Sequence, residues 1–269
     1  MGQTKIFSGS AAGADAAVAD IADGSTVLIG GFGTAGLPYA LIDALIRHGA
    51  KDLTVVNNNA GNGDTGLAAL LAAGQVRKMI CSFPRQTDSW VFDALYREAK
   101  IELELVPQGN LAERMRAAGA GIGAFFCPTG VGTPLAEGKE VREIDGRTYV
   151  CEYPISGDVA LIGAYVGDRM GNLTYRKTAR NFGPVMATAA KITIAEVRRV
   201  VEVGAIDPET VITPGIFVDR ILDLGTSGQH DAKGSDDAKG PDDAKGPDAK
   251  GPDAKDWDAK DWGVGERAS

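Results

Sequence analysis

Short apolar segments alternate with amphipathic segments between residues 25 and 197, and this alternation limits the folds open to the chain. The apolar segments predict strands at 25–32, 53–59, 76–83, 101–107, 159–167 and 191–197. The amphipathic segments predict helices at 38–49, 66–74, 89–100 and 111–120. In the first of these helices, Pro38 occupies a first-turn position and Gly49 marks the end. The pattern favours an α/β fold: an open, mostly parallel sheet flanked by helices.

The composition changes sharply near residue 226, where a degenerate Asp-Ala-Lys repeat punctuated by glycine and proline begins. Residues 226–269 contain eleven acidic and seven basic residues, so they carry −4 of the chain's net charge of −8. So polar a segment cannot offset about 1–2 kcal/mol of backbone ordering per residue. We therefore predict a folded domain at 1–225 and a disordered, solvated tail at 226–269, which includes Trp257 and Trp262.

The charge and hydropathy of the chain exclude several classes of function. A net charge of −8, an isoelectric point near 4.9 and the lack of a clustered basic segment argue against a nucleic-acid partner. The sequence contains no run of 18 apolar residues, and its first 20 residues lack the pattern of a signal peptide. We expect a cytoplasmic protein with no membrane partner.

Cysteine and histidine are too sparse and too scattered to predict a metal site or a disulfide framework. Cys81, Cys127 and Cys151 lie far apart in the sequence, and the histidines are His48 and His230. Neither a Cys-x-x-Cys pair nor a Cys/His ligand spacing occurs. We expect each cysteine to be a small apolar filler in a reducing compartment.

A glycine-rich turn follows the first predicted strand. Gly31, Gly33 and Gly36 fit the G-x-G-x-x-G pattern of dinucleotide-binding folds. That pattern requires an acidic residue after the second strand to bind the ribose, but asparagines stand at 57–59. Three neighbouring residues depart further from the pattern: Gly30, Phe32 and Pro38. A nicotinamide-dependent oxidoreductase, a turn without a ligand and a sugar-phosphate-sensing module remain as alternatives.

Side-chain amides follow two other predicted strands. Residues 57–63 include four asparagines and two glycines, and Gln108 stands between Pro107 and Gly109 on the loop after 101–107. Ligands of open α/β sheets bind beyond the carboxyl ends of the strands, where these loops meet. Because an amide donates hydrogen bonds without adding charge, the loops are candidates to stabilise a developing oxyanion.

Many separated motifs resemble those of the A (alpha) subunit of family I 3-oxoacid CoA-transferases. They are GGFGTAGLP, NNAGNG, SFPRQ, VPQGNLAER, GIGAFFCPTGVGT, REIDGRTYV, GDRMGNLTYRKTARNFGP and VITPGIFV. The resemblance spans roughly residues 1–222 and implies the CoA-transferase or NagB/RpiA-like variety of α/β fold. CSFPRQTDSWVF and VPQGNLAERMRAAGAGIGAFFCPTG are most similar to members that act on 3-oxoadipate in aromatic-acid catabolism.

The resemblance implies transfer of CoA from succinyl-CoA to 3-oxoadipate, with acetoacetate or acetate as alternative acceptors. The family's nucleophile is a glutamate in a Ser-Glu-Asn-Gly motif of the B (beta) subunit, and this sequence lacks that motif. Glu137 and Glu152 have different flanking residues, so we expect them to be surface or structural. The implied partner is a B subunit in an A2B2 complex, and the CoA thioester is a substrate, with no cofactor or metal.

The resemblance also assigns site residues. Gln108 corresponds to the amide that polarises the thioester carbonyl, and Asn58 to the asparagine that contacts the acyl group. The sequence has Asn57 where the family commonly has serine, so which amide of 57–59 acts is open. The remaining residues expected to line the substrate site are Gly30, Gly31, Phe32, Gly33, Gly36, Asn57, Asn59 and Arg85.

Two groups of basic residues have alternative interpretations. Arg85 in SFPRQ either pairs with the distal carboxylate of a dicarboxylic substrate or forms an ordinary ion pair at the surface or a subunit interface. Arg176, Lys177 and Arg180 pair either with CoA phosphates or with acidic residues of the B subunit, and we favour the subunit interface.

Overall fold

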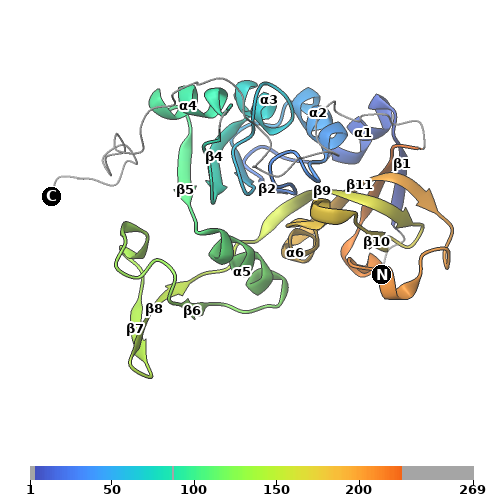
Figure 1. Cartoon of the computed structure of the whole chain (residues 1–269). Helices are drawn as coiled ribbons and strands as arrows, with labels where there is room; N and C mark the ends of the chain where they lie inside the picture. Colours follow the sequence, from blue (N-terminus) through green and yellow to red (C-terminus); the bar gives the residue numbers. More distant parts are fainter. Residues whose placement is uncertain (1–3, 87, 226–269) are drawn as a thin grey trace, which may run out of the picture. The chain divides into compact units, whose positions relative to one another are not determined.

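A nine-stranded sheet forms the centre of the computed structural model, which describes residues 4–86 and 88–225. Eight strands lie in the order β1-β12-β11-β9-β2-β3-β4-β5, and β10 pairs with β9 (Figure 1). Within the described residues, the pairing of β9 with β10 is antiparallel and the other pairings of this sheet are parallel. The strands are β1 (Lys5–Ser8), β2 (Thr26–Ile29), β3 (Leu53–Val56), β4 (Val76–Cys81), β5 (Glu102–Leu105), β9 (Gly157–Asp168), β10 (Leu173–Thr174), β11 (Ala190–Val201) and β12 (Arg220–Asp223). The predicted open, mostly parallel α/β sheet is therefore confirmed.

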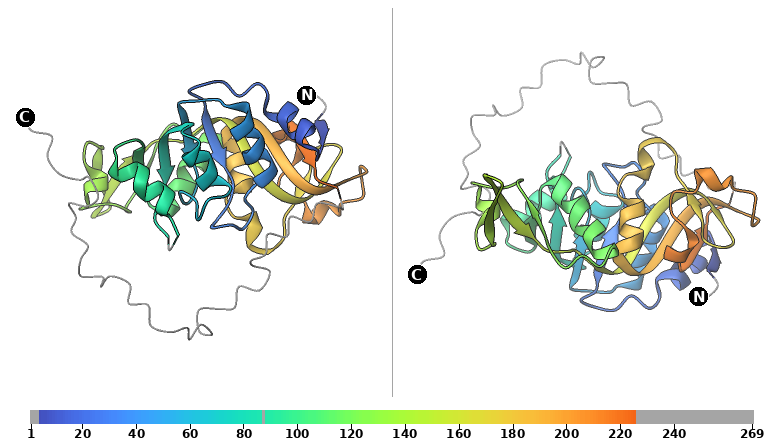
Figure 2. Two further views of the ribbon diagram at one scale, coloured as in Figure 1. Left: turned by 90° about the horizontal axis from the view of Figure 1, so that it is seen from above. Right: turned by 90° about the horizontal axis from the view of Figure 1, so that it is seen from below.

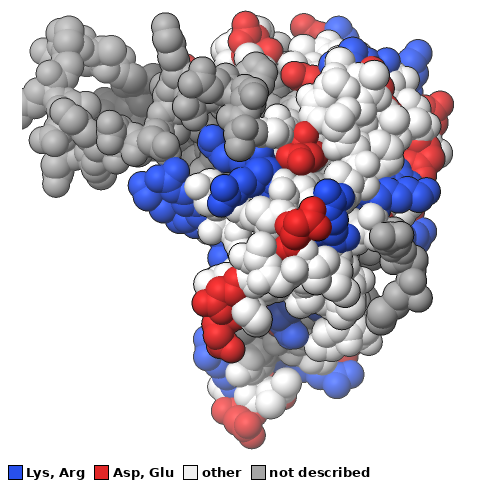
Figure 3. Space-filling model, turned by 90° about the vertical axis from the view of Figure 1, so that its right-hand side faces the viewer, with Lys and Arg blue, Asp and Glu red and all other residues white. Residues whose placement is uncertain are grey.

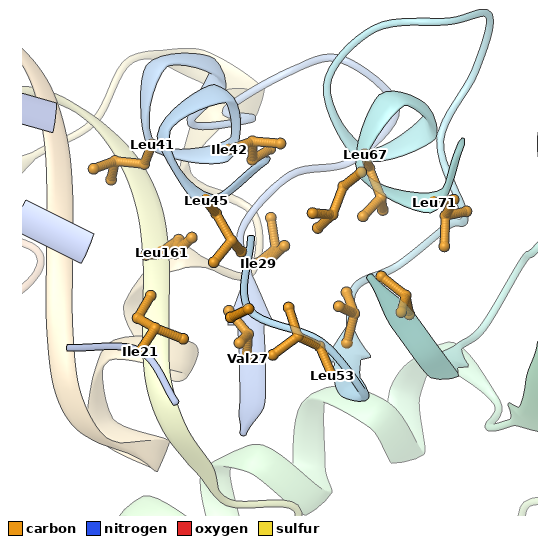
Figure 4. Close-up of a cluster of buried hydrophobic side chains, with 14 of the residues drawn as sticks. Ile21, Val27, Ile29, Leu41, Ile42, Leu45, Leu53, Leu67, Leu71 and Leu161 are labelled. Atoms are coloured by element: carbon orange, nitrogen blue, oxygen red, sulfur yellow. The ribbon is translucent and has the colours of Figure 1, made fainter. Parts of the chain in front are cut away.

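Helices cover both faces of the sheet. They are α1 (Ala11–Val18), α2 (Tyr39–His48), α3 (Leu67–Ala72), α4 (Trp90–Arg97), α5 (Gln108–Gly119) and α6 (Gly183–Ala189). The views from above and below show α1 to α4 on one face and α5 with α6 on the other (Figure 2). Since strand side chains alternate between faces, Val27 and Ile29 pack with α1 to α4 (Figure 4), whereas Leu28 packs with α5 and α6.

The order of the strands reverses between β2 and β9. From β2 the chain steps through β3 and β4 to β5, whereas from β9 it steps in the opposite direction to β11 and β12. Loops at the carboxyl ends of two such neighbouring strands leave the sheet in opposite directions. This reversal identifies the edge that holds the loops after β2, β3, β4 and β5 as the place for a ligand.

A second, three-stranded antiparallel sheet was not predicted. It consists of β6 (Phe125–Cys127), β8 (Arg147–Glu152) and β7 (Val141–Ile144) in that order. All four residues of β7 are exposed, so its sequence lacks the alternation of a half-buried strand. The sheet is tied to α5 at Glu152, whose Oε1 accepts hydrogen bonds from Asn110 Nδ2 at 3.1 Å and Lys139 Nζ at 2.8 Å.

Several predicted boundaries were wrong. The strands predicted at 25–32 and 53–59 end at Ile29 and Val56, because Gly31 has a φ of +133° and the chain turns at 57–59. Helix α5 begins at Gln108 rather than at 111, since Pro107 directly precedes its first turn. Besides the second sheet, the strands β1, β10 and β12 and the helices α1 and α6 had no prediction. The predicted tail 226–269 lies outside the described residues.

Candidate active site

Three neighbouring strands each present one polar side chain where they end. Pairing continues beyond β3, β4 and β5, because Asn57 N donates to Ile80 O at 3.1 Å and Val106 N donates to Cys81 O at 2.9 Å. The backbone oxygen of Asn58 also accepts from Phe83 N at 3.0 Å. Asn58, Ser82 and Gln108, which we call the polar cluster, therefore follow adjacent strands in sheet order.

The side chains of the polar cluster converge on one atom. Asn58 Oδ1 accepts hydrogen bonds from Ser82 Oγ and from Gln108 Nε2, each at 2.7 Å. Asn58 is 1% exposed, whereas Gln108 is exposed at the start of α5. Within residues 4–86 and 88–225, no hydrogen-bond acceptor is found for Asn58 Nδ2. The cluster can thus offer uncharged N–H donors to a ligand.

Asn57 and Asn59 use their side chains to hold the backbone. Asn57 Nδ2 donates to Ile29 O at 2.7 Å, and its Oδ1 accepts from Asn59 N at 2.9 Å. Asn59 Oδ1 accepts from Gly61 N at 2.8 Å, while its buried Nδ2 has no partner among the described residues. Substrate contact by either residue stays a prediction. Because both ends of the Asn57 amide are occupied, these bonds favour Asn58 over Asn57 as the amide that acts, whereas they leave Asn59 Nδ2 as a second candidate.

The turn after β2, residues 30–36, is held by its own backbone and by one distant side chain. Gly31, Gly33 and Gly36 have φ values of +133°, +60° and +74°, which favour glycine. Asn181 Oδ1 accepts from Gly31 N at 3.1 Å, and Asn181 Nδ2 donates to Ala35 O at 2.9 Å. The glycine turn therefore lies against the loop that carries Asn181.

A carboxyl group from β11 caps the helix that follows the glycine turn. Glu196 Oε2 accepts from Ala40 N at 2.8 Å and Leu41 N at 3.1 Å in the first turn of α2. Burial, with a smaller contribution from the nearby Asp43, raises the pKa of Glu196 to about 7 against the lowering effect of these two bonds. Glu196 had not been predicted, because only the fold brings β11 to α2.

Comparison with known proteins settles the family. Residues 12–224 match the family model described as Coenzyme A transferase. The chain belongs to the coenzyme A transferase family. The transferase is 70% identical to the A subunit of 3-oxoadipate CoA-transferase from Pseudomonas putida, over 77% of this chain and 89% of that protein. It is 63% identical to the protein of the same name in Acinetobacter baylyi, over 79% and 93% of the two chains.

Solved structures share the fold of this transferase. Acyl-CoA transferase YdiF from Escherichia coli O157:H7 superposes with a TM-score of 0.71 at 24% identity, covering 82% of this chain and 47% of that one. The present chain thus spans about half the length of YdiF. The decarboxylase AibA/AibB has a TM-score of 0.70 at 26% identity, with 84% of both chains covered. Since one fold is found in a transferase and a decarboxylase, the fold alone does not fix the reaction.

Arg85 of the transferase lies on the loop after β4 and is engaged within the chain. Its Nε lies 2.7 Å from Oδ1 of Asp93 on α4, and the guanidinium side chain is mostly buried. An ion pair was one of the two predicted roles. Pairing with a substrate carboxylate stays a prediction.

The basic cluster at 176–180 lies on the loop that holds the glycine turn. Arg176, Lys177 and Arg180 are exposed, and no carboxylate partner is found for them in the described part of the chain. The face in Figure 3 carries both basic and acidic side chains. Whether the cluster meets CoA phosphates or the B subunit stays a prediction.

The other predicted roles concern carboxylates, cysteines and the membrane. Glu137 is exposed, and Glu152 is buried in the contacts described above, which agrees with surface and structural roles. Cys81 and Cys151 are buried, and burial raises the pKa of Cys81 to about 12. The described residues contain neither a group of three potential metal ligands nor a helix able to cross a membrane.

Proposed function

We propose that the chain is the A subunit of a cytoplasmic 3-oxoacid CoA-transferase that moves CoA from succinyl-CoA to 3-oxoadipate in aromatic-acid degradation. The observation that carries this proposal is the 70% identity to the A subunit of the Pseudomonas putida 3-oxoadipate CoA-transferase. The polar cluster supports it, because a thioester oxygen that becomes negative requires hydrogen-bond donors placed in advance.

The proposed reaction begins with a glutamate of the B subunit. Its carboxylate attacks the thioester carbon, the C–S bond breaks, and an acyl-glutamyl anhydride and CoA thiolate form. The thiolate attacks the glutamyl carbonyl, releasing succinate and leaving glutamyl-CoA. The acceptor carboxylate then repeats the two steps in reverse order, which transfers CoA and restores the glutamate.

In this proposal the A subunit supplies the donors for each tetrahedral oxyanion. Gln108 Nε2 and Asn58 Nδ2 are the donors, since the first is exposed and the second has no internal acceptor among the described residues. The glycine turn lets the backbone approach the substrate, with Phe32 beside it 47% exposed. CoA acts as a substrate, and no further cofactor or metal is invoked.

Acetoacetate is the alternative acceptor. The chain is 52% identical to the A subunit of a probable succinyl-CoA:3-ketoacid coenzyme A transferase of Bacillus subtilis, over 77% of this chain and 86% of that protein. The higher identity to the 3-oxoadipate transferases favours 3-oxoadipate.

Co-expression with a B subunit from a neighbouring gene tests the proposal. We expect an A2B2 complex that converts succinyl-CoA and 3-oxoadipate faster than succinyl-CoA and acetoacetate, followed by the absorbance of the magnesium enolate of the product. Each of the two subunits, assayed alone, is the control. Full transfer without the B subunit, or a covalent CoA adduct on one of this chain's own glutamates, would contradict the proposal.

Arg85→Met tests how the acceptor is chosen. If Arg85 binds the distal carboxylate, the variant loses its preference for 3-oxoadipate over acetoacetate while the slower acetoacetate reaction persists. Asp93→Asn is the matched variant, because it removes the ion-pair partner and keeps the arginine. An unchanged preference in Arg85→Met would limit Arg85 to the ion pair.

A further inference from the structure

Ser82 lies at the centre of the polar cluster but is absent from the predicted site residues. Its hydroxyl is 2.7 Å from Asn58 Oδ1 and 3.2 Å from the backbone oxygen of Asn58. The backbone holds the two residues together, since Ser82 N and Phe83 N both donate to Asn58 O, at 3.2 and 3.0 Å. Ser82 therefore has a fixed position beside the Asn58 amide.

The surroundings of Ser82 do not suit a nucleophile. A serine hydroxyl attacks only when a neighbouring base takes its proton. Among the described residues, the hydrogen-bond partners of the Ser82 hydroxyl are the two oxygens of Asn58, which are neutral carbonyl acceptors. His48, the histidine in the described residues, bonds to Ile21 O instead. The hydroxyl is thus a donor to Asn58.

Two donors on one oxygen determine which way the Asn58 amide faces. With Oδ1 held by Ser82 and Gln108, the Nδ2 group must lie on the other side of the amide. With the hydroxyl present, a reversal of the Asn58 amide would exchange the 2.7 Å bond that Ser82 Oγ donates to Oδ1 for the longer, 3.2 Å bond to the backbone oxygen of Asn58. Without the hydroxyl this cost is absent, so the Asn58 and Gln108 amides can turn over together and keep their mutual bond with donor and acceptor exchanged. The reversed pair would present Asn58 Oδ1, which repels an oxyanion, where Nδ2 now lies.

We propose that Ser82 is a positioning residue that fixes the Asn58 amide with its N–H donors toward the thioester. This role rests on the proposed transferase function. It means that the orientation of the Asn58 and Gln108 amides depends on Ser82, which follows β4, the strand between β3 and β5. Since Ser82 acts through Asn58, its loss should weaken the chemical step and leave substrate binding unaltered.

Kinetics of the complex with the B subunit test this role. We expect Ser82→Ala to lower kcat about tenfold, the loss typical of one neutral hydrogen bond, with an unchanged KM for succinyl-CoA. Ser82→Thr retains the hydroxyl and should recover most of the rate. Ser25→Ala is the matched control, because that hydroxyl bonds to Ala22 O at the amino end of β2.

A double variant separates positioning from general structural support. If Ser82 acts through Asn58, Ser82→Ala has no further effect on kcat in an Asn58→Ala chain. If the losses of kcat in the two single variants multiply in the double variant, or if Ser82→Ala has a wild-type kcat, the proposal is overturned while the transferase function stays intact.

A neutron crystal structure of the Ser82→Ala chain, in which the deuterium atoms of the amide distinguish Nδ2 from Oδ1, gives a second readout that needs no activity. We expect the Asn58 side chain to be rotated or disordered there. If the wild-type complex transfers no CoA, the proposed function fails. Independently of that result, an Asn58 side chain that is unchanged in the Ser82→Ala structure overturns the positioning role.

Discussion

The glycine turn and the polar cluster lie at the same edge of the sheet but are fixed by different means. In the turn, positive φ angles and a distant side chain, Asn181, set the backbone. In the polar cluster, Ser82 and Gln108 bond directly to Asn58 from neighbouring strands. A change in the turn should therefore reduce stability and activity together, whereas a change in the exposed member of the cluster should reduce activity alone.

The largest expected effect belongs to Gln108→Ala. Loss of one oxyanion donor lowers kcat by roughly 100- to 1,000-fold in enzymes of comparable chemistry. Because Gln108 is exposed, the free energy of unfolding should be unchanged. Steady-state transfer and urea unfolding measure the two quantities.

Glu113→Gln, on the same helix, is the control for Gln108→Ala. It removes only an exposed ion pair with Arg116 and should retain full activity. A parallel loss of stability and rate in Gln108→Ala would contradict the division between the two regions.

Gly36→Ala should produce the largest loss of stability in the turn. A Cβ there would lie 2.5 Å from the backbone oxygen of Ala179, at a φ of +74°. The left-handed conformation costs about 1–2 kcal/mol, and the overlap with backbone adds about 1–3 kcal/mol. We expect urea unfolding to reveal both costs and transfer activity to fall with them.

Gly33→Ala is the matched variant within the turn. It has a φ of +60°, but a Cβ meets nothing within 4 Å, so the expected loss is the conformational cost alone, about 1–2 kcal/mol. Equal losses at Gly33 and Gly36 would show that contact with the Asn181 loop does not hold the turn.

Asn181→Ala should have a smaller effect, of about 1–3 kcal/mol, because it leaves Gly31 N without a partner among the described residues and removes one of the two donors to Ala35 O, the other being Phe32 N. Asn181→Asp keeps an acceptor for Gly31 N and loses the donor to Ala35 O, so its unfolding free energy should lie between those of wild type and alanine. If the aspartate variant is no better than alanine, the Gly31 bond contributes little.

The two regions also differ in how far the sequence predicted them. The predicted roles of Gln108 and Asn58 come from a family resemblance, and their adjacency follows from parallel strands ending at one edge. The contacts of Ser82 and Asn181 could not be predicted, since each depends on residues brought together only by the fold. Gly31, Gly33 and Gly36 indicated a close backbone approach, but a dinucleotide pattern and this turn share the same spacing.

Strand and helix boundaries failed for local reasons. The strands predicted at 25–32 and 53–59 run past the ends of β2 and β3, because buried residues lie on both sides of those ends, although the buried residues at 57–59 are asparagines. The antiparallel sheet was missed because β7 is exposed throughout and Glu152, a buried charge, resembles a surface residue in sequence. Its partners come from α5 and from the segment before β7.

The smallest expected effect concerns pH and again divides the two regions. Asn58, Ser82 and Gln108 do not titrate, whereas the pKa of Glu196, beneath the start of α2, is raised to about 7 from a usual value of 4.5. With a raised carboxyl pKa, the folded state binds more protons than the unfolded state between these values. The contribution to stability is therefore complete below about pH 4.5 and is lost as the pH rises through about 7.

Glu196→Gln removes this titration and keeps an oxygen that can accept from Ala40 N and Leu41 N. We expect it to match wild type at about pH 5 and to be more stable at about pH 8, by roughly 1–2 kcal/mol because Glu196 is only half-buried. Urea unfolding at the two pH values measures the difference.

Asp43→Asn, which removes the nearby carboxylate and keeps Glu196, should lower the pKa of Glu196 and move the transition to lower pH. A constant difference between Glu196→Gln and wild type at both pH values would mean that the Glu196 carboxyl is already ionised below pH 5, and the glycine turn would then be as insensitive to pH as the polar cluster.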